Sequence, residues 1–480
     1  MSLRFYNTPT RSIENFVPRE PDTTKLYTCG PTVYDTPHVG NWAAYIRWDI
    51  LVRLLRINGY TVTRIMNITD VGHLVSDEDT GEYKVEKGAR REGKTAWDVA
   101  QYYTDDFLRG LAALNCIMPD HLARATDFIP QQLELVRTLK QKGYTYQISD
   151  GIYFDTAKFP RYADFAHLDL KDQKAGARVT FNPEKRNHSD FALWKFTAPR
   201  ETRDMQWQTP VDLLEDTPLN DTGMGFPGWH LECSAIAMTL LGDTLDIHTG
   251  GIDHIPVHHT NEIAQSEAAT DLPFSSFWLH ANFMTVDGMK ISKSLNNGYT
   301  LEDLAEKGFT PLDLRMLILQ SHYRTEANFT FDSMESAHAR LKHWREAASL
   351  RWQTRAYASE ASLPSLATIR VLLETLNDDI DTPGALQVID KIITDVERAS
   401  LDTISSNSLN DLFEAIDGLL GLNLLAATPD IEDEDKALIL ARVQARVSKD
   451  YRRSDDIRDE LLIKGIGLRD VPGDTVWFWA

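Results

Sequence analysis

Cysteine is scarce in this sequence, whose 480 residues contain only Cys29, Cys116 and Cys233. Three thiols cannot form the disulfide framework of a small secreted domain. No stretch approaches the ~18 consecutive apolar residues that a membrane-spanning helix needs. The first residues, MSLRFYNTPTRS, also lack the apolar segment of a secretory signal. We therefore expect a cytoplasmic protein that does not enter a membrane.

Internal repeats and low-complexity segments are also absent, which excludes fibrous and solenoid proteins. The chain is too long for one hydrophobic core, so two to four domains are expected. A net charge of −21 argues against indiscriminate binding to nucleic acids. It does not exclude an RNA partner met through a local basic surface such as residues 441–470, although such a charged run is also typical of a solvated helix.

The first 70 residues predict an α/β fold. TKLYTCG is a short strand, HVGNWAAYIRWDILVRLLRINGY is a helix that ends at Asn58-Gly59, and TVTRIMNITDV is a second strand. Two strands joined by a helix indicate a parallel sheet. Further amphipathic helices are expected at 96–115 and 130–142.

Between residues 145 and 225 the pattern changes to short strands separated by turns, which we interpret as an insertion. The parallel-sheet pattern then returns, with helices in GWHLECSAIAMTLLG and HHTNEIAQSEAAT on either side of the strand TLDIHTGG. From about residue 310 the chain is nearly all helical. Residues 436–480 predict two helices and an aromatic tail.

Two cysteines, a histidine and a glutamate form a candidate metal site. Cys29 and Cys233 each lie beside a junction between a strand and a helix, and such junctions meet at the carboxyl edge of a parallel sheet. His258 and Glu262 are four residues apart in an expected helix, so they share one face. Two thiolates, an imidazole and a carboxylate suit zinc. Their wide separation in the sequence favours an active-site metal over a structural zinc ribbon.

These residues also have simpler interpretations. A lone cysteine is most often a buried core thiol, and Cys116 is assigned to that group. His259 adjoins His258, so the residues alone do not decide which histidine is the ligand. HHTNE is not a metallopeptidase signature, because HExxH requires a glutamate directly after its first histidine.

The segment PHVGN at 37–41 opens a helix directly after the first strand. Exposed N–H groups at a helix start attract phosphate. His38 can donate to a phosphoryl oxygen, and Gly40 leaves room for a flat base. A helix start of this kind is a weak signal by itself.

The segment DGMKISKSLNNGYT at 287–300 is a stronger signal. Lys290 and Lys293 flank Ser292 in a loop, where ammonium groups can stabilise the charge of departing pyrophosphate. The alternative is an exposed basic turn. Both motifs on one α/β scaffold favour a nucleotide site.

At these motifs the sequence resembles the class I aminoacyl-tRNA synthetases, whose two signatures are similar to His-x-Gly-Asn at 38–41 and Lys-Ile-Ser-Lys-Ser at 290–294. Other segments resemble the cysteinyl-tRNA synthetase family in particular. They are YTCGPTVYDTPHVGN, NITD, DFALWK, GFPGWHLECSAIAM, DIHTGGID, HHTNEIAQSEA, LNDDIDTPGAL and KDYRRSDDIRDELLIKGIGLRD. They run from Cys29 to the C-terminal tail and so cover most of the chain.

The resemblance implies an α/β Rossmann-like catalytic domain with a parallel sheet and an insertion, followed by an all-α helical bundle and a small C-terminal domain. The expected boundaries are 1–115 for the first half of the catalytic domain, 116–224 for the connective insertion, 225–285 for the second half, 286–325 for the lysine-containing loop and stem-contact segment, 326–427 for the tRNA-binding bundle and 428–480 for the anticodon-reading domain.

The resemblance also implies roles for individual residues. Zinc, one ion per chain, is expected on Cys29, Cys233, His258 and Glu262, because the family pattern selects the first histidine of the pair. Catalysis is assigned to His38, Asn41, Lys290 and Lys293. ATP, with Mg²⁺, is expected to contact these four residues and Gly40, Asp253 and Ser292. Cysteine is expected to contact Trp229, Thr69, Gly30 and His248, and tRNA to contact Arg446, Tyr451 and Arg458.

The implied activity is the ligation of L-cysteine to tRNA(Cys) through a cysteinyl-adenylate, by a monomeric enzyme. Zinc would distinguish the substrate thiolate from the hydroxyl of serine, which an apolar pocket separates by only ~1–3 kcal/mol. Two alternatives stay open from the residues: a cysteine-adenylating ligase with a small-molecule acceptor, and a non-catalytic RNA-binding or zinc-storage descendant. Asn41, Ile291 and the run Val71-Gly72-His73 depart from the usual family pattern.

Overall fold

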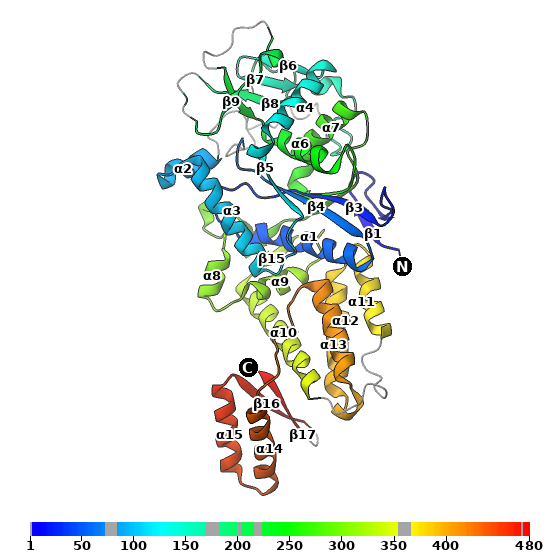
Figure 1. Ribbon diagram of the computed structural model, residues 1–480, viewed down its shortest axis with the longest axis vertical. Coiled ribbons are helices and arrows are strands. Elements are labelled where there is room, and N and C mark those ends of the chain that lie inside the picture. Colours follow the sequence, from blue (N-terminus) through cyan, green and yellow to red (C-terminus); the bar gives the residue numbers. More distant parts are fainter. Residues whose placement is uncertain are drawn as a thin grey trace.

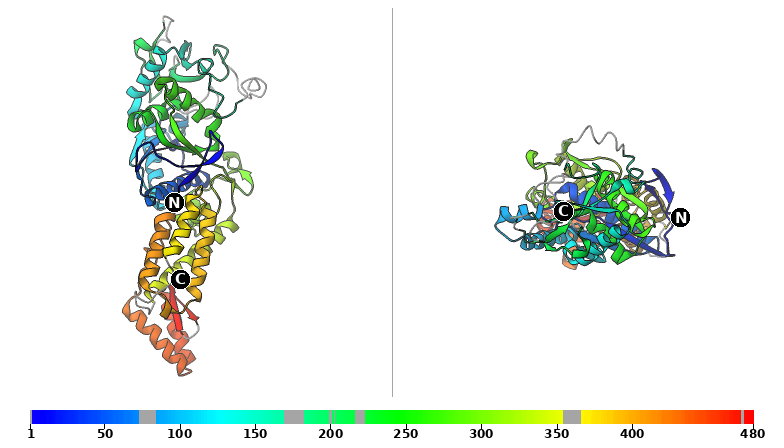
Figure 2. Two further views of the ribbon diagram at one scale, coloured as in Figure 1. Left: turned by 90° about the vertical axis from the view of Figure 1, so that its right-hand side faces the viewer. Right: turned by 90° about the horizontal axis from the view of Figure 1, so that it is seen from above.

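The computed structural model describes residues 2–72, 84–168, 182–198, 201, 203–215, 223–353, 366–471 and 474–480. His73, one of the departures from the family pattern, lies outside these residues. The molecule is elongated, with an antiparallel sheet at one end, a parallel sheet next to it, then a bundle of helices and a small domain at the other end (Figure 1). A view turned by 90° shows the same succession (Figure 2). No helix in the described part of the chain is long and apolar enough to cross a membrane.

The centre of the molecule is a five-stranded sheet in which every strand pairs in parallel with its neighbour, as the sequence predicts. Its strands, in spatial order, are β12 (Ser275–Ala281), β11 (Leu245–Gly251), β3 (Thr23–Thr28), β4 (Thr61–Ile68) and β5 (His121–Arg124). The chain runs outward from β3 in one direction through β4 and β5, and in the other through β11 and β12. The carboxyl ends of β3 and β11 therefore form a topological switch point, where ligands bind in such sheets.

Strand β5 lies beyond the expected domain boundary at residue 115. It pairs in parallel with β4, through Ile65 opposite His121. The first half of the parallel sheet therefore extends past that boundary into the range expected for the insertion.

Helix α1 (Val39–Ile57) joins β3 to β4 and is buried on almost every side. Apolar residues at spacings of four, Trp42, Ile46, Ile50 and Leu54, are at most 2% exposed. The helix ends before Gly59, whose φ of +92° favours glycine. The helices around the sheets are α2 (Lys84–Glu92), α3 (Ala96–Ala113), α4 (Ile129–Gln141), α6 (Trp229–Leu241) and α7 (Thr260–Thr270).

The expected insertion forms a second, antiparallel sheet with its own hydrophobic core around Phe154, Phe191 and Trp194. In spatial order its strands are β6 (Thr145–Ile148), β7 (Gly151–Phe154), β8 (Phe191–Phe196), β10 (Met224–Pro227) and β9 (Trp207–Gln208). Strand β10 leads directly into α6, so the insertion returns the chain to the edge of the parallel sheet.

The C-terminal half is mostly helical, as expected. A small sheet consists of β13 (Met284–Val286), β14 (Met289–Lys290) and β15 (Ala327–Phe329). The helices of this part are α8 (Leu301–Glu306), α9 (Pro311–Leu319), α10 (Phe331–Ser349), α11 (Leu366–Asn377), α12 (Thr382–Arg398) and α13 (Ser406–Leu420). The last domain holds α14 (Asp433–Val447), α15 (Tyr451–Ile463), β16 (Ile466–Val471) and β17 (Asp474–Trp479). The aromatic tail is strand β17, which pairs with β16 and buries Trp477 against the helices.

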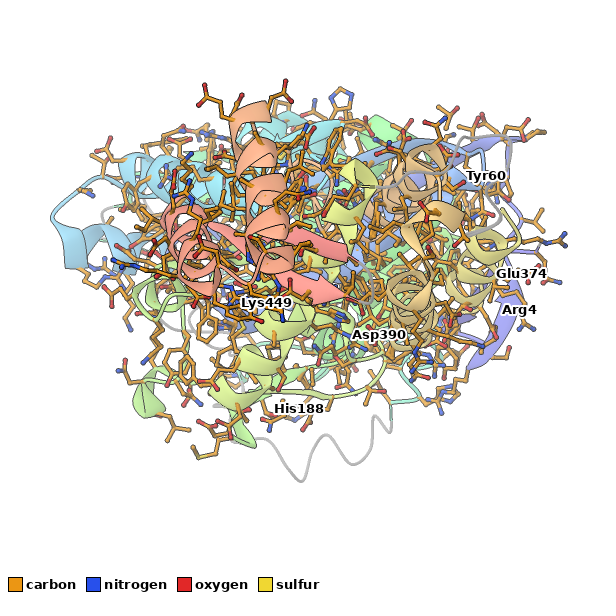
Figure 3. All side chains as sticks on the ribbon, turned by 90° about the horizontal axis from the view of Figure 1, so that it is seen from below. Arg4, Tyr60, His188, Glu374, Asp390 and Lys449 are labelled. Carbon is orange, nitrogen blue, oxygen red and sulfur yellow. The ribbon has the colours of Figure 1, made fainter. Side chains whose placement is uncertain are left out.

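The first residues form a hairpin of β1 (Arg4–Asn7) and β2 (Ser12–Asn15) that contacts both the parallel sheet and the helical bundle. The Asn7 amide donates to the Ser276 carbonyl at 3.1 Å and accepts from the Trp278 N–H at 2.9 Å, both on β12. The Tyr6 N–H donates to Asp379 at 2.8 Å, in the loop between α11 and α12. Figure 3, from below, shows Arg4 and Glu374 of α11 at the same edge of the molecule.

Candidate active site

The structure brings together the four predicted metal ligands. Cys29 follows β3, Cys233 lies in α6, His258 lies in a π-helical turn (Ile255–His259) and Glu262 lies in the first turn of α7. One ligand atom from each side chain lies within 4.8 Å of every other. Cys233, His258 and Glu262 are buried and Cys29 is partly buried. The cluster stands at the carboxyl ends of β3 and β11, at the switch point of the sheet.

Neighbouring side chains hold two of these four in position. His248 Nε2 lies 2.8 Å from Glu262 Oε2, and His230 Nδ1 lies 3.0 Å from His258 Nδ1. The indole ring of Trp229 stacks on the His258 imidazole with 4.3 Å between ring centroids. Hydrogen bonds to the outer atoms of metal ligands fix ring orientation and raise ligand basicity, so this arrangement is typical of a metal centre.

The inward atoms of the cluster fit a cation. His258 Nε2 lies 2.8 Å from Glu262 Oε1, yet this buried oxygen has no partner with hydrogen-bond geometry among the described residues. Two sulfurs, one ring nitrogen and one carboxylate oxygen within 4.8 Å of one another are a donor set that a tetrahedral zinc ion accepts. These residues therefore fit the metal that the sequence predicts.

A second group of four overlaps with the first. Cys29 and Glu262 also converge with His248 and His259 within the same 4.8 Å. The structure therefore leaves both histidines of the pair near Glu262, with His258 on the side of both thiols and His259 on the side of Cys29 alone. His259 Nε2 lies 3.4 Å from the Cys29 sulfur. Our assignment of His258 as the ligand remains a prediction.

Burial and local charge shift every titratable group of the cluster. Burial raises the pKa of both the Cys29 and Cys233 thiols. Burial alone would raise the pKa of Glu262, but His248 and His258 outweigh it and hold that pKa at about 2. Burial lowers the pKa of His258, but Glu262 and Cys233 raise it to about 10. The protein without metal thus holds two protonated thiols beside an imidazolium–carboxylate pair.

Three of the residues expected to contact cysteine make hydrogen bonds to side chains in and around this cluster. The Thr69 hydroxyl donates to Glu232 Oε1 at 2.7 Å, and the Gly30 N–H donates to the Asn67 side chain at 2.8 Å. A Cβ at Gly30 would lie 1.7 Å from the Asn67 carbonyl, so only glycine fits there. His248 is fully buried against Glu262, which gives it an orienting contact with a predicted ligand. Asp253 is exposed in the turn that follows β11.

His38 caps the N-terminus of α1 through reciprocal hydrogen bonds with Asn41. The Asn41 N–H donates to His38 Nδ1 at 3.3 Å, and the His38 N–H donates to Asn41 Oδ1 at 3.0 Å. Because Nδ1 accepts a hydrogen bond, the neutral ring carries its proton on Nε2. Burial lowers the pKa of His38, which favours that neutral form. The asparagine that departs from the family pattern therefore fixes the ring that precedes it.

The lysine-containing loop packs directly on this helix start. The Val39 N–H donates to the Tyr299 carbonyl at 2.8 Å, and His38 and Thr300 form an isolated antiparallel bridge. A Cβ at Gly40 would lie 2.7 Å from the tip of Ile291. The glycine therefore permits the close approach of the two predicted nucleotide motifs.

The two lysines of the loop differ in their surroundings. Lys293 forms an ion pair with Asp35 and lies 5.2 Å from the centroid of the Tyr34 ring. Lys290 ends strand β14 and is exposed. The Ser292 N–H donates to the Asn297 side chain at 2.9 Å, which closes the loop on itself. Both ammonium groups thus stand on a short, internally bonded loop beside His38.

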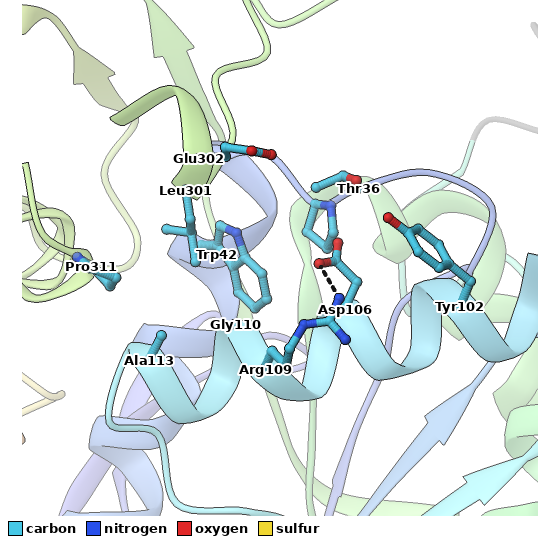
Figure 4. A pocket seen from close by; sticks show the side chains of 11 residues that line it. Thr36, Trp42, Tyr102, Asp106, Arg109, Gly110, Ala113, Leu301, Glu302 and Pro311 are labelled. Carbon is cyan, nitrogen blue, oxygen red and sulfur yellow. Dashed lines mark hydrogen bonds and ion pairs between the residues drawn. The ribbon is translucent and has the colours of Figure 1, made fainter. Parts of the chain in front are cut away.

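A cavity of about 240 Å³ lies between the start of α1, α3 and α8 (Figure 4). It is lined by Thr36, Pro37, Trp42, Tyr102, Asp106, Arg109, Gly110, Ala113, Leu301, Glu302 and Pro311. None of these residues belongs to the metal cluster. We therefore do not assign the cavity to the amino-acid substrate.

The predicted tRNA contacts lie on the C-terminal domain. Arg446 lies 2.6 Å and Arg458 3.7 Å from Asp470 Oδ2, beside the fully buried Arg442. Tyr451 begins α15 and is 61% exposed, so its ring is available for stacking. The two arginines are thus gathered around one carboxylate, an arrangement that their spacing in the sequence does not reveal.

Three residues of the site escaped the sequence analysis. His230 contacts His258, Glu232 accepts from Thr69, and Asp35 pairs with Lys293. His230 and Glu232 stand within the segment that contains Cys233, so a histidine and an acid next to a predicted ligand were available signals. Asp35 and Lys293 are 258 residues apart, and no spacing connects them.

The strand order, the capped helix start and the lysine loop packed against it define the catalytic domain of a class I aminoacyl-tRNA synthetase. A family model described as "tRNA synthetases class I (C) catalytic domain" matches residues 15–339. The cysteine–tRNA ligase of Treponema denticola is 37% identical over 99% of both chains. Cysteine–tRNA ligase 1 of Burkholderia lata is 39% identical over 98% of this chain and 96% of that protein. The chain belongs to the cysteine–tRNA ligase family.

Solved structures agree on the fold. Methionyl-tRNA synthetase of Mycobacterium tuberculosis, in complex with methionyl-adenylate, superposes with a TM-score of 0.60 at 16% identity. The match covers 84% of this chain and 92% of that one. This likeness supports the class I architecture with an additional helical domain.

Proposed function

We propose that the protein activates L-cysteine with ATP and Mg²⁺ and then transfers the cysteinyl group to the 3′ end of tRNA(Cys). The observation that carries the proposal is that two features lie at the same edge of the sheet. A soft donor set of two sulfurs, an imidazole and a carboxylate stands at the switch point of the sheet, and a helix start beside the same sheet edge meets the lysine loop. The full-length match to cysteine–tRNA ligases supports the same activity.

In the first step the cysteine carboxylate attacks the α-phosphorus of ATP, and pyrophosphate leaves. No protein nucleophile is required, so the site acts by positioning reactants and stabilising charge. His38 donates from Nε2 to a phosphate oxygen, because its Nδ1 is occupied by the Asn41 N–H. Lys290 and Lys293 lie on the adjoining loop, where their ammonium groups stabilise the charge that develops on pyrophosphate.

Zinc on Cys29, Cys233, His258 and Glu262 would supply a soft Lewis acid that prefers the substrate sulfur to the oxygen of serine. His248 and His230 hold Glu262 and His258 in the orientation that binding requires. Trp229 covers His258 and limits the space at its ring. Thr69 and Gly30, which we assign to the binding of cysteine, are held in place by their bonds to Glu232 and Asn67.

In the second step the terminal ribose hydroxyl of tRNA attacks the activated carboxyl group, and AMP leaves. The helical bundle and the C-terminal domain extend away from the sheet (Figure 1), as a long nucleic-acid partner requires. We assign contacts with tRNA to Arg446, Tyr451 and Arg458. The exposed Tyr451 ring is suited to stacking on an unpaired base.

The test combines two assays on the purified protein. We expect cysteine-dependent exchange of pyrophosphate into ATP, with serine inactive, and charging of an unmodified tRNA(Cys) transcript. Exchange without charging would instead support a ligase that passes cysteine to a small molecule. Absence of both would support a non-catalytic descendant.

A further inference from the structure

Three hydrogen bonds connect the metal cluster to the N-terminal hairpin. The Cys29 sulfur lies 3.4 Å from His259 Nε2, His259 Nδ1 lies 2.7 Å from His280 Nε2, and His280 Nδ1 lies 2.7 Å from the Thr8 hydroxyl. His259 and His280 are at most 5% exposed, and Thr8 is half-buried. Each imidazole ring therefore uses both nitrogens, and the contacts form one continuous chain of hydrogen bonds.

Which atoms donate and which accept in these hydrogen bonds depends on which side chains bind the metal. A thiolate ligand at Cys29 can only accept a hydrogen bond, so His259 Nε2 must donate to it. A neutral imidazole carries one ring proton, so it donates from one nitrogen and accepts at the other. His259 Nδ1 then accepts from His280 Nε2–H, and His280 Nδ1 accepts from the Thr8 hydroxyl.

The opposite direction follows if His259 is itself a ligand. Its Nε2 would then be bound to the metal and its proton would sit on Nδ1. His280 would accept at Nε2 and donate from Nδ1 to Thr8. The two ligand sets that the geometry permits thus place the imidazole protons on opposite nitrogens of both rings.

We infer that Thr8 and His280 are positioning residues for the metal site, and that hydrogen bonds run one way from the Thr8 hydroxyl through His280 and His259 to the Cys29 sulfur. The inference rests on the zinc site proposed above. Donors aimed at a metal-bound sulfur stabilise the thiolate, and side chains that hydrogen-bond to a metal ligand strengthen metal binding. Thr8, directly after β1, thereby contributes to a site whose first ligand, Cys29, lies 21 positions later.

The hydroxyl of Thr8 can be removed without releasing the backbone that carries it. The Thr8 N–H donates to the Trp278 carbonyl at 3.0 Å, and the neighbouring Asn7 side chain bonds twice to β12. Thr8→Val keeps these contacts and nearly the same shape. Thr8→Ser keeps the hydroxyl. Thr10→Val is the matched control, because Thr10 donates to the Asn7 carbonyl in the same hairpin but does not join the chain.

The first measurement is zinc affinity by competition with a chromophoric chelator, on full-length protein. We expect Thr8→Val to weaken zinc binding about fivefold, the effect of one hydrogen bond, while Thr8→Ser and Thr10→Val match wild type. The sulfur-to-cobalt charge-transfer band of the Co²⁺-substituted protein should shift in Thr8→Val alone. Thermal unfolding of the metal-free variants identifies a folding defect, because Thr8→Val and Thr10→Val should then unfold at similar temperatures.

The second measurement reads the protons directly. Long-range ¹H–¹⁵N correlation spectra of zinc-loaded protein with labelled histidine show which nitrogen of each ring is protonated, and His259→Gln and His280→Gln variants assign the signals. Protons on Nε2 of both rings support the inference. Protons on Nδ1 of both rings, a doubly protonated His259, or equal zinc affinity in Thr8→Val and wild type would overturn it. A wild-type protein that binds no zinc would instead refute the zinc site itself.

Discussion

Asp49 of α1 and Arg315 of α9 form a fully buried ion pair that joins the catalytic sheet to the helical half of the molecule. Arg315 also donates to the carbonyls of Leu420 at 2.6 Å and Leu114 at 2.9 Å, so one guanidinium contacts three separate elements. Arg53, one turn after Asp49, shares the same carboxylate at 2.7 Å. The C-terminal end of α1 is thereby fixed to the bundle.

Replacing Arg315 with methionine should destabilise the protein by about 3–5 kcal/mol, because a buried carboxylate loses its main partner. Arg4→Met is the matched control, since the pair of Arg4 with Asp378 is about half exposed and should contribute less than ~1 kcal/mol. Urea unfolding followed by circular dichroism measures both. Equal unfolding free energies for the two variants would contradict the assigned role.

Replacing Cys233 with serine tests the metal site and its selectivity together. The variant should lose most bound zinc, and its preference for cysteine over serine should fall to the ~1–3 kcal/mol, or 10–200-fold, of an apolar pocket. Pyrophosphate exchange with each amino acid and metal analysis give the result. Cys116→Ser is the control, because Cys116 lies near Arg315, away from the cluster. Full serine rejection by a zinc-free Cys233→Ser protein would refute zinc-based selection.

Alanine at Gly40 should separate the two nucleotide motifs. The added Cβ would meet Ile291 at 2.7 Å and the His38 ring at 3.2 Å, so the loop must shift. We expect a higher KM for ATP and a lower kcat in pyrophosphate exchange. Gly418→Ala in α13 is the control, because its Cβ would meet Ile57 at an ordinary 3.6 Å, and alanine favours a helix by about 0.5–1 kcal/mol. Unchanged ATP kinetics in Gly40→Ala would contradict the packing argument.

Replacing Lys293 with methionine should reduce kcat of pyrophosphate exchange by about 10²–10³-fold, because a charge aimed at the departing group is lost. Overall stability should change little, since the side chain is 70% exposed. Lys307→Met serves for comparison, because Lys307 lies at the end of α8, outside the lysine-containing motif, with its ammonium group 4.7 Å from the centroid of the Phe331 ring. A loss of similar size in both variants would argue for a general effect of charge.

The small C-terminal domain should loosen in acid. The Arg442 guanidinium holds the pKa of Asp470 well below its usual range. A depressed carboxyl pKa contributes stability above the unfolded value of about 3.9, and this contribution disappears as the pH falls through the folded value. Hydrogen-exchange protection of residues 466–471, compared at pH 5 and below pH 4, should fall in wild type. Asp470→Asn should lack that pH dependence and should already be less protected at pH 5.

The metal cluster could be assembled from the sequence because each ligand stands near the end of a strand or the start of a helix. Parallel sheets collect those positions at one edge, and donor chemistry then selects among the residues found there. Contacts whose two partners lie on different elements could not be predicted, because no spacing in the sequence connects them. Whether His258 or His259 faces the thiols depends on a π-helical turn, and the pairing of Asp35 with Lys293 depends on how a loop folds over α1.

Boundaries were harder to predict than elements. Strand β5 contains four residues, of which only Ala123 is fully buried, so it carries too few apolar positions to mark it as part of the sheet. The sequence likewise predicts only an aromatic tail where β16 and β17 form a hairpin. Strand β5 forms because it pairs with β4, which lies far earlier in the sequence, rather than because of a local pattern.

The N-terminal hairpin has a consequence for how the chain is made. Its contacts reach Trp278 on one side and Asp379 on the other, so the hairpin cannot complete them until Asp379, 373 residues after Tyr6, has been synthesised. At roughly 5–20 residues per second, that interval lasts on the order of tens of seconds. During synthesis the Cys29 thiol lacks the other side chains of the metal cluster until Cys233, His258 and Glu262 have been added to the chain.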